Sequence, residues 1–172
     1  MAFLAIAYPV IESSDFEWIQ DIRKLHDRQF DLVNPHITLV FGTNKLNLSE
    51  FTKHIQSKVR TFKSFKVTMD SAKTIEGNSI DDCHAFLIPS VGFNEINELH
   101  DLLYQDELES ELRRDMPFIP HLTIGSGSKE EMTVLVNKVN EQRISINGNV
   151  GEVNIISFDG SKVKDINMLS LV

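Results

Sequence analysis

Two histidine–threonine pairs are the residues of this sequence best suited to chemistry. One pair stands in the stretch Pro35-His36-Ile37-Thr38-Leu39 and the other in Pro120-His121-Leu122-Thr123-Ile124. An imidazole can accept or donate a proton near neutral pH, and a threonine hydroxyl can donate a hydrogen bond to a phosphoryl oxygen. Alternate side chains of a strand share one face, so each histidine is predicted to lie beside its threonine.

The two stretches indicate a duplicated unit. A chain of this composition contains about 0.3 His-x-Thr triplets by chance, yet here two copies share a preceding proline and flanking apolar residues. Gly42 and Gly125 close the two apolar runs, and the histidines are 85 residues apart. Ala2-Phe3-Leu4 recurs 83 residues later as Ala85-Phe86-Leu87. Near-equal offsets are typical of an internal repeat.

Composition sets the class of protein and its partners. The chain has 172 residues, of which 41% are hydrophobic and 24% charged, and a formal net charge of −8. We expect a cytoplasmic monomer with no membrane partner, because no apolar run approaches the roughly 20 residues that span a bilayer. The lone cysteine, Cys83, excludes an internal disulfide. No stripe of cations suits a long duplex nucleic acid, whereas a small nucleotide or oligonucleotide needs only one or two phosphate contacts. The local basic cluster is interpreted as a solvated helix face: Lys53, Lys58, Arg60, Lys63 and Lys66.

Apolar periodicity and turn residues divide the chain into strands and helices. Strands are predicted at about 2–8, 36–41, 65–69, 84–88, 121–125, 144–150, 153–158 and 163–171. Helices are predicted to end near 28, 60, 104 and 140. Their proposed N-caps are Ser13, Ser14 or Asp15 for the first helix, Ser49 for the second and the segment 126–128 for the fourth. Pro9 and Pro89 are expected to end strands, 77–79 to form a turn, and 105–119 to form a loop or frayed helix.

This order of elements predicts an α+β fold. Residues 1–172 are expected to form one bilobal domain, built from two strand-helix-strand-helix units at roughly 1–75 and 83–172. A pseudo-two-fold axis would relate the units, with their antiparallel sheets around a central cleft. The two His-x-Thr strands would then face each other across the cleft.

Facing histidines can catalyse displacement at phosphorus. One imidazole removes a proton from water or a ribose hydroxyl, and the other protonates the departing alkoxide. The threonines stabilise the non-bridging oxygens, so no metal and no cofactor is required. The same pair can hydrolyse a cyclic phosphate, transesterify a diester or run a ligation.

The motifs resemble those of the two-histidine phosphoesterase superfamily, which includes RNA ligase-like 2′,3′-cyclic phosphodiesterases and 2′,5′-oligonucleotide phosphodiesterases. The segment 117–123 resembles the second motif of that family with its lead-in, and 153–158 resembles its late strand. This resemblance implies that His36 and His121 are catalytic and that Thr38 and Thr123 bind phosphate. It also implies a bilobal α+β fold with a central cleft.

Other side chains carry weaker expectations. Four aromatic residues near the predicted cleft strands can stack on a base, although core packing is the commoner role of such residues: Tyr8, Phe41, Phe118 and Phe158. Arg113 and Arg114 can close over a phosphate or serve as solvated loop residues. The remaining histidines, His26, His54, His84 and His100, are interpreted as solvated or satisfied in the core.

Two further classes of function stay open. A binding module could hold RNA ends or phosphorylated nucleotides in the same cleft without turnover. A metal-dependent hydrolase could use His36 and His121 as ligands, but each motif offers a threonine where a carboxylate or second histidine is expected. Residues 81–84, Asp-Asp-Cys-His, are better explained as a turn than as a metal site.

Overall fold

The computed structural model describes residues 1–77, 79 and 81–172, and its strands pair antiparallel throughout the two sheets. The elements, in chain order, are β1 (Ala2–Ala7), β2 (Val10–Ile11), α1 (Ser13–His26), β3 (Ile37–Thr43), α2 (Leu48–Val59), β4 (Phe65–Glu76), β5 (Cys83–Val91), α3 (Phe93–Leu103), the 3₁₀ helix η1 (Asp106–Glu111), β6 (Leu122–Gly127), α4 (Lys129–Glu141), β7 (Ile146–Val150), β8 (Glu152–Phe158) and β9 (Val163–Ser170). The predicted α+β class is confirmed. None of the helices in the described ranges is both long and apolar enough to cross a membrane.

The two sheets repeat one arrangement. One sheet has the order β3-β1-β8-β9, and the other has β2-β7-β4-β5-β6. In each, a His-x-Thr strand lies at the edge beside the first strand of its own half, β3 beside β1 and β6 beside β5. The third strand comes from the other half, because β8 pairs with β1 and β4 pairs with β5. The sheets therefore cross the boundary between the units expected at 1–75 and 83–172, and this exchange pairs edges that would otherwise stay open.

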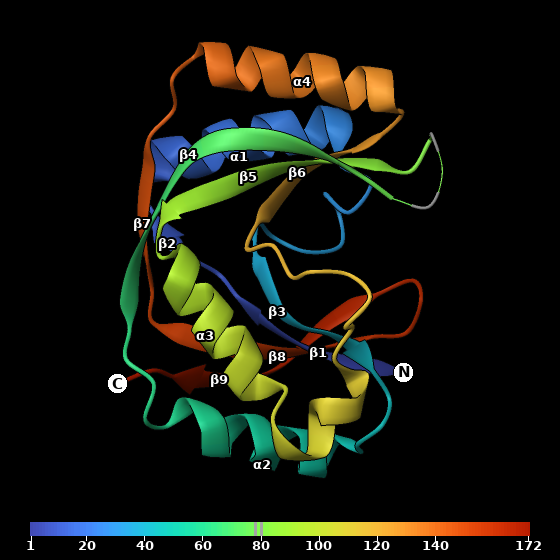
Figure 1. The fold of residues 1–172 in the computed structure, drawn as a ribbon, viewed down its shortest axis with the longest axis vertical. Helices are drawn as coiled ribbons and strands as arrows, with labels where there is room; N and C mark the ends of the chain where they lie inside the picture. The colour runs from blue at the N-terminus through green and yellow to red at the C-terminus, as the bar shows by residue number, and fades with distance from the viewer. Residues whose placement is uncertain (78, 80) are drawn as a thin grey trace.

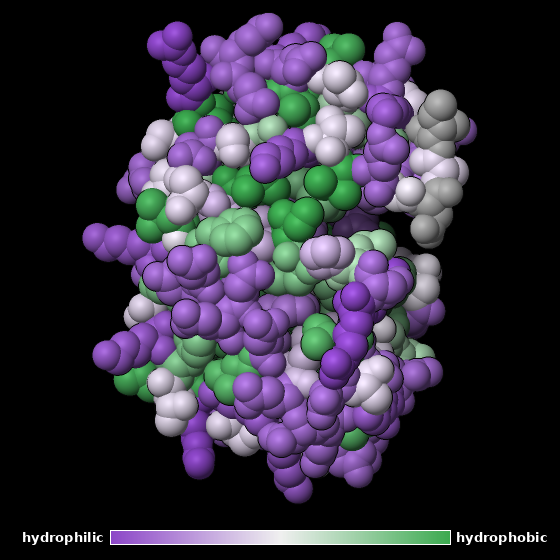
Figure 2. All heavy atoms as spheres, viewed as in Figure 1, coloured by the Kyte–Doolittle hydropathy of each residue, from purple (hydrophilic) through white to green (hydrophobic). Residues whose placement is uncertain are grey.

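The helices are exchanged in the same way. α1, from the first half, packs with α4 over the sheet that contains β6, and α3, from the second half, packs with α2 over the sheet that contains β3 (Figure 1). Each helix buries an apolar stripe, such as Phe51, Ile55 and Val59 on α2. Figure 2 shows hydrophobic residues gathered in a band across the middle of this face, with hydrophilic residues above and below.

Helix capping differs from the prediction at two of three sites. α2 begins at Leu48, and its cap is Asn47, which forms a reciprocal capping box with Glu50; Ser49 lies inside the helix. Of Asn47 and Ser49, only Asn47 has a glutamate three residues later to complete the box. α1 begins at Ser13 after Glu12, which makes no side-chain cap bond. The cap of α4 is confirmed as Ser128.

Strand register corrects two further predictions. Pro89 does not end its strand, since β5 continues to Val91. The pairing shifts on both sides of the Met69–Pro89 pair, and this irregularity accommodates the missing N–H. The repeat of Ala2-Phe3-Leu4 in residues 85–87 is not a structural one, because Ile6 lies opposite Thr38 where Phe86 lies opposite Thr123. Asn78, in the predicted turn at 77–79, lies outside the described residues.

Candidate active site

His36 and His121 occupy matching positions at the entrance to their strands. Each follows a buried proline and immediately precedes the first residue of β3 or β6. Nδ1 of His36 is 2.8 Å from the carbonyl oxygen of Asn34, and Nδ1 of His121 is 2.6 Å from that of Ile119. A carbonyl oxygen can only accept, so Nδ1 of each ring carries the hydrogen. In the neutral imidazole, Nε2 then holds a lone pair that can accept a proton.

The two motifs converge on one cavity of about 890 Å³. His36, Thr38, His121 and Thr123 all line it, and β3 and β6 contact each other. Within the described residues, neither threonine hydroxyl is engaged in a hydrogen bond. Both hydroxyls are therefore available to a ligand. The sequence predicted that the two strands would face each other, and the structure places them on the same cavity.

A break in strand pairing follows each threonine. Thr38 pairs with Ile6 and Val40 pairs with Ala5, so the register skips Leu39. Thr123 and Gly125 pair with Phe86 and Ala85, which skips Ile124. Such bulges re-aim the neighbouring side chains and recur beside active sites. The threonine thus faces the cavity while the next two residues are both buried.

Helix α3 supplies partners for the open edge of β3. Nδ1 of His100 is 2.8 Å from the carbonyl oxygen of Leu39, the residue skipped by the pairing. Phe41 donates its N–H to the hydroxyl of Tyr104 at 3.0 Å. His100 and Tyr104 are one helical turn apart, so a single helix face serves both backbone groups. His100 was expected to be solvated or satisfied in the core; it is hydrogen-bonded and also lines the cavity.

Aromatic rings flank both histidines. Phe86 stacks on His121, with ring centroids 3.7 Å apart, and His84 stacks on Phe86 at 5.7 Å. Tyr8 meets His36 edge-on at 6.3 Å. These contacts restrict the rotation of both imidazoles. Sequence reasoning missed Phe86; its position two residues after His84 in a strand, on the same face, was the available signal.

The four predicted stacking residues separate into two groups. Phe41 and Phe118 line the cavity and meet edge-on at 6.4 Å, and Phe118 also stacks on His100. Tyr8 and Phe158 do not line the cavity. Tyr8 contacts the ring of His36, and Phe158 pairs with Ala2 and Val163 in the sheet. Arg113 and Arg114 both line the cavity.

Burial sets the protonation of both histidines. It lowers the pKa of His36, against a hydrogen bond to the carbonyl of Asn34 that favours the charged form. It also lowers the pKa of His121 to about 4, with smaller contributions from the neighbouring His36 and His84. A low-dielectric site disfavours the charged imidazolium. Both rings are accordingly neutral at pH 7 in the free protein.

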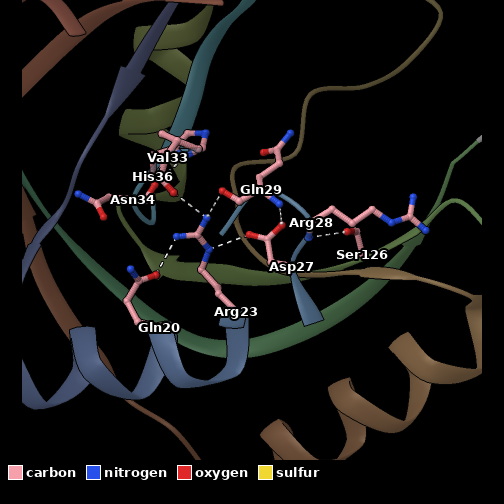
Figure 3. Close-up of polar contacts among 9 residues, drawn as sticks. All are labelled: Gln20, Arg23, Asp27, Arg28, Gln29, Val33, Asn34, His36 and Ser126. Carbon is pink, nitrogen blue, oxygen red and sulfur yellow. Dashed lines mark hydrogen bonds and ion pairs between the residues drawn. The ribbon is translucent and has the colours of Figure 1, made fainter. Parts of the chain in front are cut away.

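A buried ion pair holds the loop that precedes His36. Nε of Arg23 is 2.7 Å from Oδ2 of Asp27, and both side chains are 2% exposed. The guanidinium also donates to the carbonyl oxygens of Gln29 and Val33, and Asp27 accepts the N–H of Gln29 (Figure 3). The loop is thereby fixed at both ends just before Asn34, whose carbonyl orients His36. Arg23 shares the helix face of Ile19, four residues earlier, which was the signal that sequence reasoning passed over.

Several carboxylates and histidines lie near the cleft. Across the described parts of the chain, no three or more His, Cys, Asp or Glu side chains are grouped so that they could hold a metal ion. Within the segment 81–84, Nε2 of His84 lies 3.5 Å from Oδ1 of Asp82. This pair orients His84 at the cavity wall.

Two exchanged antiparallel sheets, with a His-x-Thr strand at the edge of each, form the fold of the two-histidine phosphoesterase superfamily. Residues 11–162 match the family model of the 2′-5′ RNA ligase superfamily. The chain belongs to this superfamily.

Solved structures share the fold across nearly the whole chain. Escherichia coli LigT complexed with 3′-AMP superposes with a TM-score of 0.68 at 17% identity, covering 99% of this chain and 98% of LigT. The Thermus thermophilus protein TT0787 gives 0.66 at 13% identity, and Kluyveromyces marxianus Usb1 gives 0.63 at 13%, each covering 99% of this chain and 98% of the other. No curated protein sequence matches the chain.

Proposed function

We propose that this protein is a metal-independent phosphoesterase that cleaves a 2′,3′-cyclic phosphate or a small 2′,5′-linked RNA phosphodiester. The observation that carries the proposal is the convergence of two identically anchored imidazoles and two free hydroxyls on one cavity. Membership of the 2′-5′ RNA ligase superfamily supports RNA-type substrates. Structures of E. coli LigT with 3′-AMP, ATP and NADP⁺ support a nucleotide-sized ligand.

The proposed reaction is an in-line displacement at phosphorus. Nε2 of one histidine takes a proton from the attacking water while the water oxygen bonds to phosphorus. The ester P–O bond on the opposite side breaks, and the other histidine, as imidazolium, protonates the departing ribose oxygen. Thr38 and Thr123 donate hydrogen bonds to the non-bridging oxygens. His36 and His121 exchange roles when the substrate binds in the opposite orientation.

Binding of the substrate anion raises the pKa of the histidine that acts as the general acid. Both histidines are neutral in the free protein at pH 7, because burial lowers the pKa of each. A phosphodiester anion within hydrogen-bonding distance of Nε2 favours the charged imidazole and raises its pKa. Binding of the anion is therefore coupled to uptake of one proton, which creates the general acid.

The test is turnover of nucleoside 2′,3′-cyclic phosphates and 2′,5′-linked oligoadenylate in excess chelator. We expect His36→Ala and His121→Ala each to lower kcat by about 10²–10⁴-fold. His54→Ala is the matched control, because His54 is buried but bonds the carbonyl oxygen of Leu103, away from the cavity. Wild-type activity in either cavity variant would refute the acid–base roles. Loss of activity with chelator and recovery with a divalent ion would favour a metal-dependent hydrolase.

A non-catalytic module for RNA ends or phosphorylated nucleotides is the alternative. It uses the same four residues for binding alone. Calorimetric binding of 3′-AMP without product after prolonged incubation of the cyclic and 2′,5′-linked substrates would favour it.

A further inference from the structure

A second cavity of about 270 Å³ adjoins the cleft of the two histidines. It lies between the C-terminal end of α1 and the start of α4, and its wall includes Lys24, His26 and Met132. Asp27, Arg28 and Ser126 line both cavities. The two hollows therefore lie next to each other, with Arg28 in the lining of both.

Two cations line this side cavity, although the whole chain carries a net charge of −8. Lys24 and Arg28 line it, and Lys24 makes no ion pair or side-chain hydrogen bond within the part of the chain that the structure describes. Among the residues that the structure describes, the side chain of Arg28 makes one hydrogen bond, a weak one of 3.5 Å to the carbonyl oxygen of Asp81. A guanidinium held this loosely retains donors for a ligand.

The two carboxylates in the wall already have partners. Asp27 is neutralised by the buried Arg23 at 2.7 Å. Glu131 accepts the N–H and O–H of Ser128 as part of the cap of α4, and these bonds keep the pKa of its carboxyl below the usual range. Once Asp27 is counted with Arg23, the lining retains two cations, Lys24 and Arg28, against one ionised carboxylate, Glu131. The charge balance favours an anion.

The shared wall fixes how Arg28 is presented. Its backbone N–H donates to the hydroxyl of Ser126 at 3.3 Å, which ties the loop after α1 to β6. Figure 3 shows its side chain extending away from the Arg23–Asp27 pair. The anchored backbone and the loosely held guanidinium place a cation where the two cavities adjoin.

We propose that the side cavity binds a second phosphate group of the substrate. This inference rests on the proposed function and makes it narrower. The preferred substrate class is a nucleotide or short oligonucleotide that carries one phosphate at the histidines and at least one more phosphate further along. A nucleoside with a single cyclic phosphate fills the main cleft only.

Equilibrium binding tests the subsite without requiring turnover. Adenosine 3′,5′-bisphosphate and the dinucleotide adenylyl-adenosine 3′-phosphate are titrated by calorimetry, each against adenosine 3′-phosphate, at low and at raised salt. We expect at least one of the two probes to bind the wild type about tenfold more tightly than the monophosphate, and the ratio to shrink as salt screens the contact. In the variant Lys24→Ala/Arg28→Ala, we expect the affinities of each probe and of the monophosphate to differ by no more than about twofold.

A charge-matched control separates the subsite from general electrostatics. Lys53→Ala/Arg60→Ala removes two positive charges from α2 and its C-cap, and neither residue lines either cavity. This variant should keep the wild-type ratio. A ratio near one in the wild type, or an equal loss in both double variants, overturns the subsite. Absence of turnover with every substrate would instead overturn the proposed function and leave these binding ratios to stand.

Discussion

Replacing Asp27 by asparagine tests whether the buried ion pair organises the approach to His36. Asparagine keeps the shape of the side chain and one acceptor oxygen, but removes the negative charge. Nε of Arg23, 2.7 Å from Oδ2, then faces a neutral amide in a position where both side chains are 2% exposed. The single carbonyl oxygen of asparagine cannot serve Arg23 and the N–H of Gln29 equally, because the two donors now use different oxygens of Asp27.

The contacts that Arg23 loses and keeps determine the expected loss in the free energy of unfolding. Breaking a buried ion pair by removing one partner costs about 3–5 kcal/mol. Arg23 keeps its bonds to Gln20, Gln29 and Val33, so we expect the lower end, about 3 kcal/mol in the free energy of unfolding. Since domains are commonly stable by about 5–15 kcal/mol, the variant should still fold at 25 °C.

Urea unfolding and steady-state kinetics measure the two consequences. With a typical slope of about 2 kcal/mol/M, the midpoint should fall by roughly 1.5 M. Under conditions where the variant is folded, kcat/KM should fall about tenfold, because the loop that presents Asn34 to His36 loses an anchor. Asp21→Asn, an exposed site on the same helix, should stay within about 0.5 kcal/mol. A loss below about 1 kcal/mol for Asp27→Asn would refute the reasoning and show that backbone carbonyls alone hold Arg23.

Three further predictions concern the cavity. The pH profile of kcat/KM should be bell-shaped with its maximum below about 6.5, because burial lowers the pKa of both His36 and His121. The kcat profile should lie at higher pH, since the bound anion stabilises the imidazolium; coincident profiles would contradict this. Phe86→Ala should admit water and raise the pKa of His121 from about 4 toward its ordinary value, measured by NMR titration; an unchanged value would show that Phe86 does not exclude water. Tyr104→Phe removes the acceptor of the Phe41 N–H and should lower the free energy of unfolding by about 1 kcal/mol, whereas equal stability in urea unfolding would mean that water replaces the hydroxyl.

Local sequence patterns predicted much of the fold and the main residues of the site. The two motifs stand out because proline, histidine, threonine and apolar residues recur in the same order. The helices follow from apolar stripes such as Phe51, Ile55 and Val59. Both signals depend on neighbours in the chain, and each needs only one element to be identified.

The pairing of distant strands had no such signal. Nothing in the sequence of β8 indicates that one of its two neighbours in the sheet is β1, a strand of the other half. The repeat of Ala2-Phe3-Leu4 even suggested a register that differs by three residues from the observed one, in which Ile6 and Phe86 correspond. The ring contact of Phe86 with His121 depends on that register, so it could not be predicted before the strand pairing was known.

The exchange of elements explains why the two histidines are so nearly equivalent. α1 lies between β1 and β3 in the chain but packs on β6 of the other sheet, and α3, between β5 and β6, makes the reverse crossing onto β3. The two histidines share three features, although their aromatic neighbours differ: a buried proline before the ring, Nδ1 on a backbone carbonyl and a lowered pKa. Burial disfavours the charged form of both rings in the free protein. The side on which the leaving oxygen lies decides which imidazole becomes charged, so the orientation of the substrate, and not the free protein, assigns the roles.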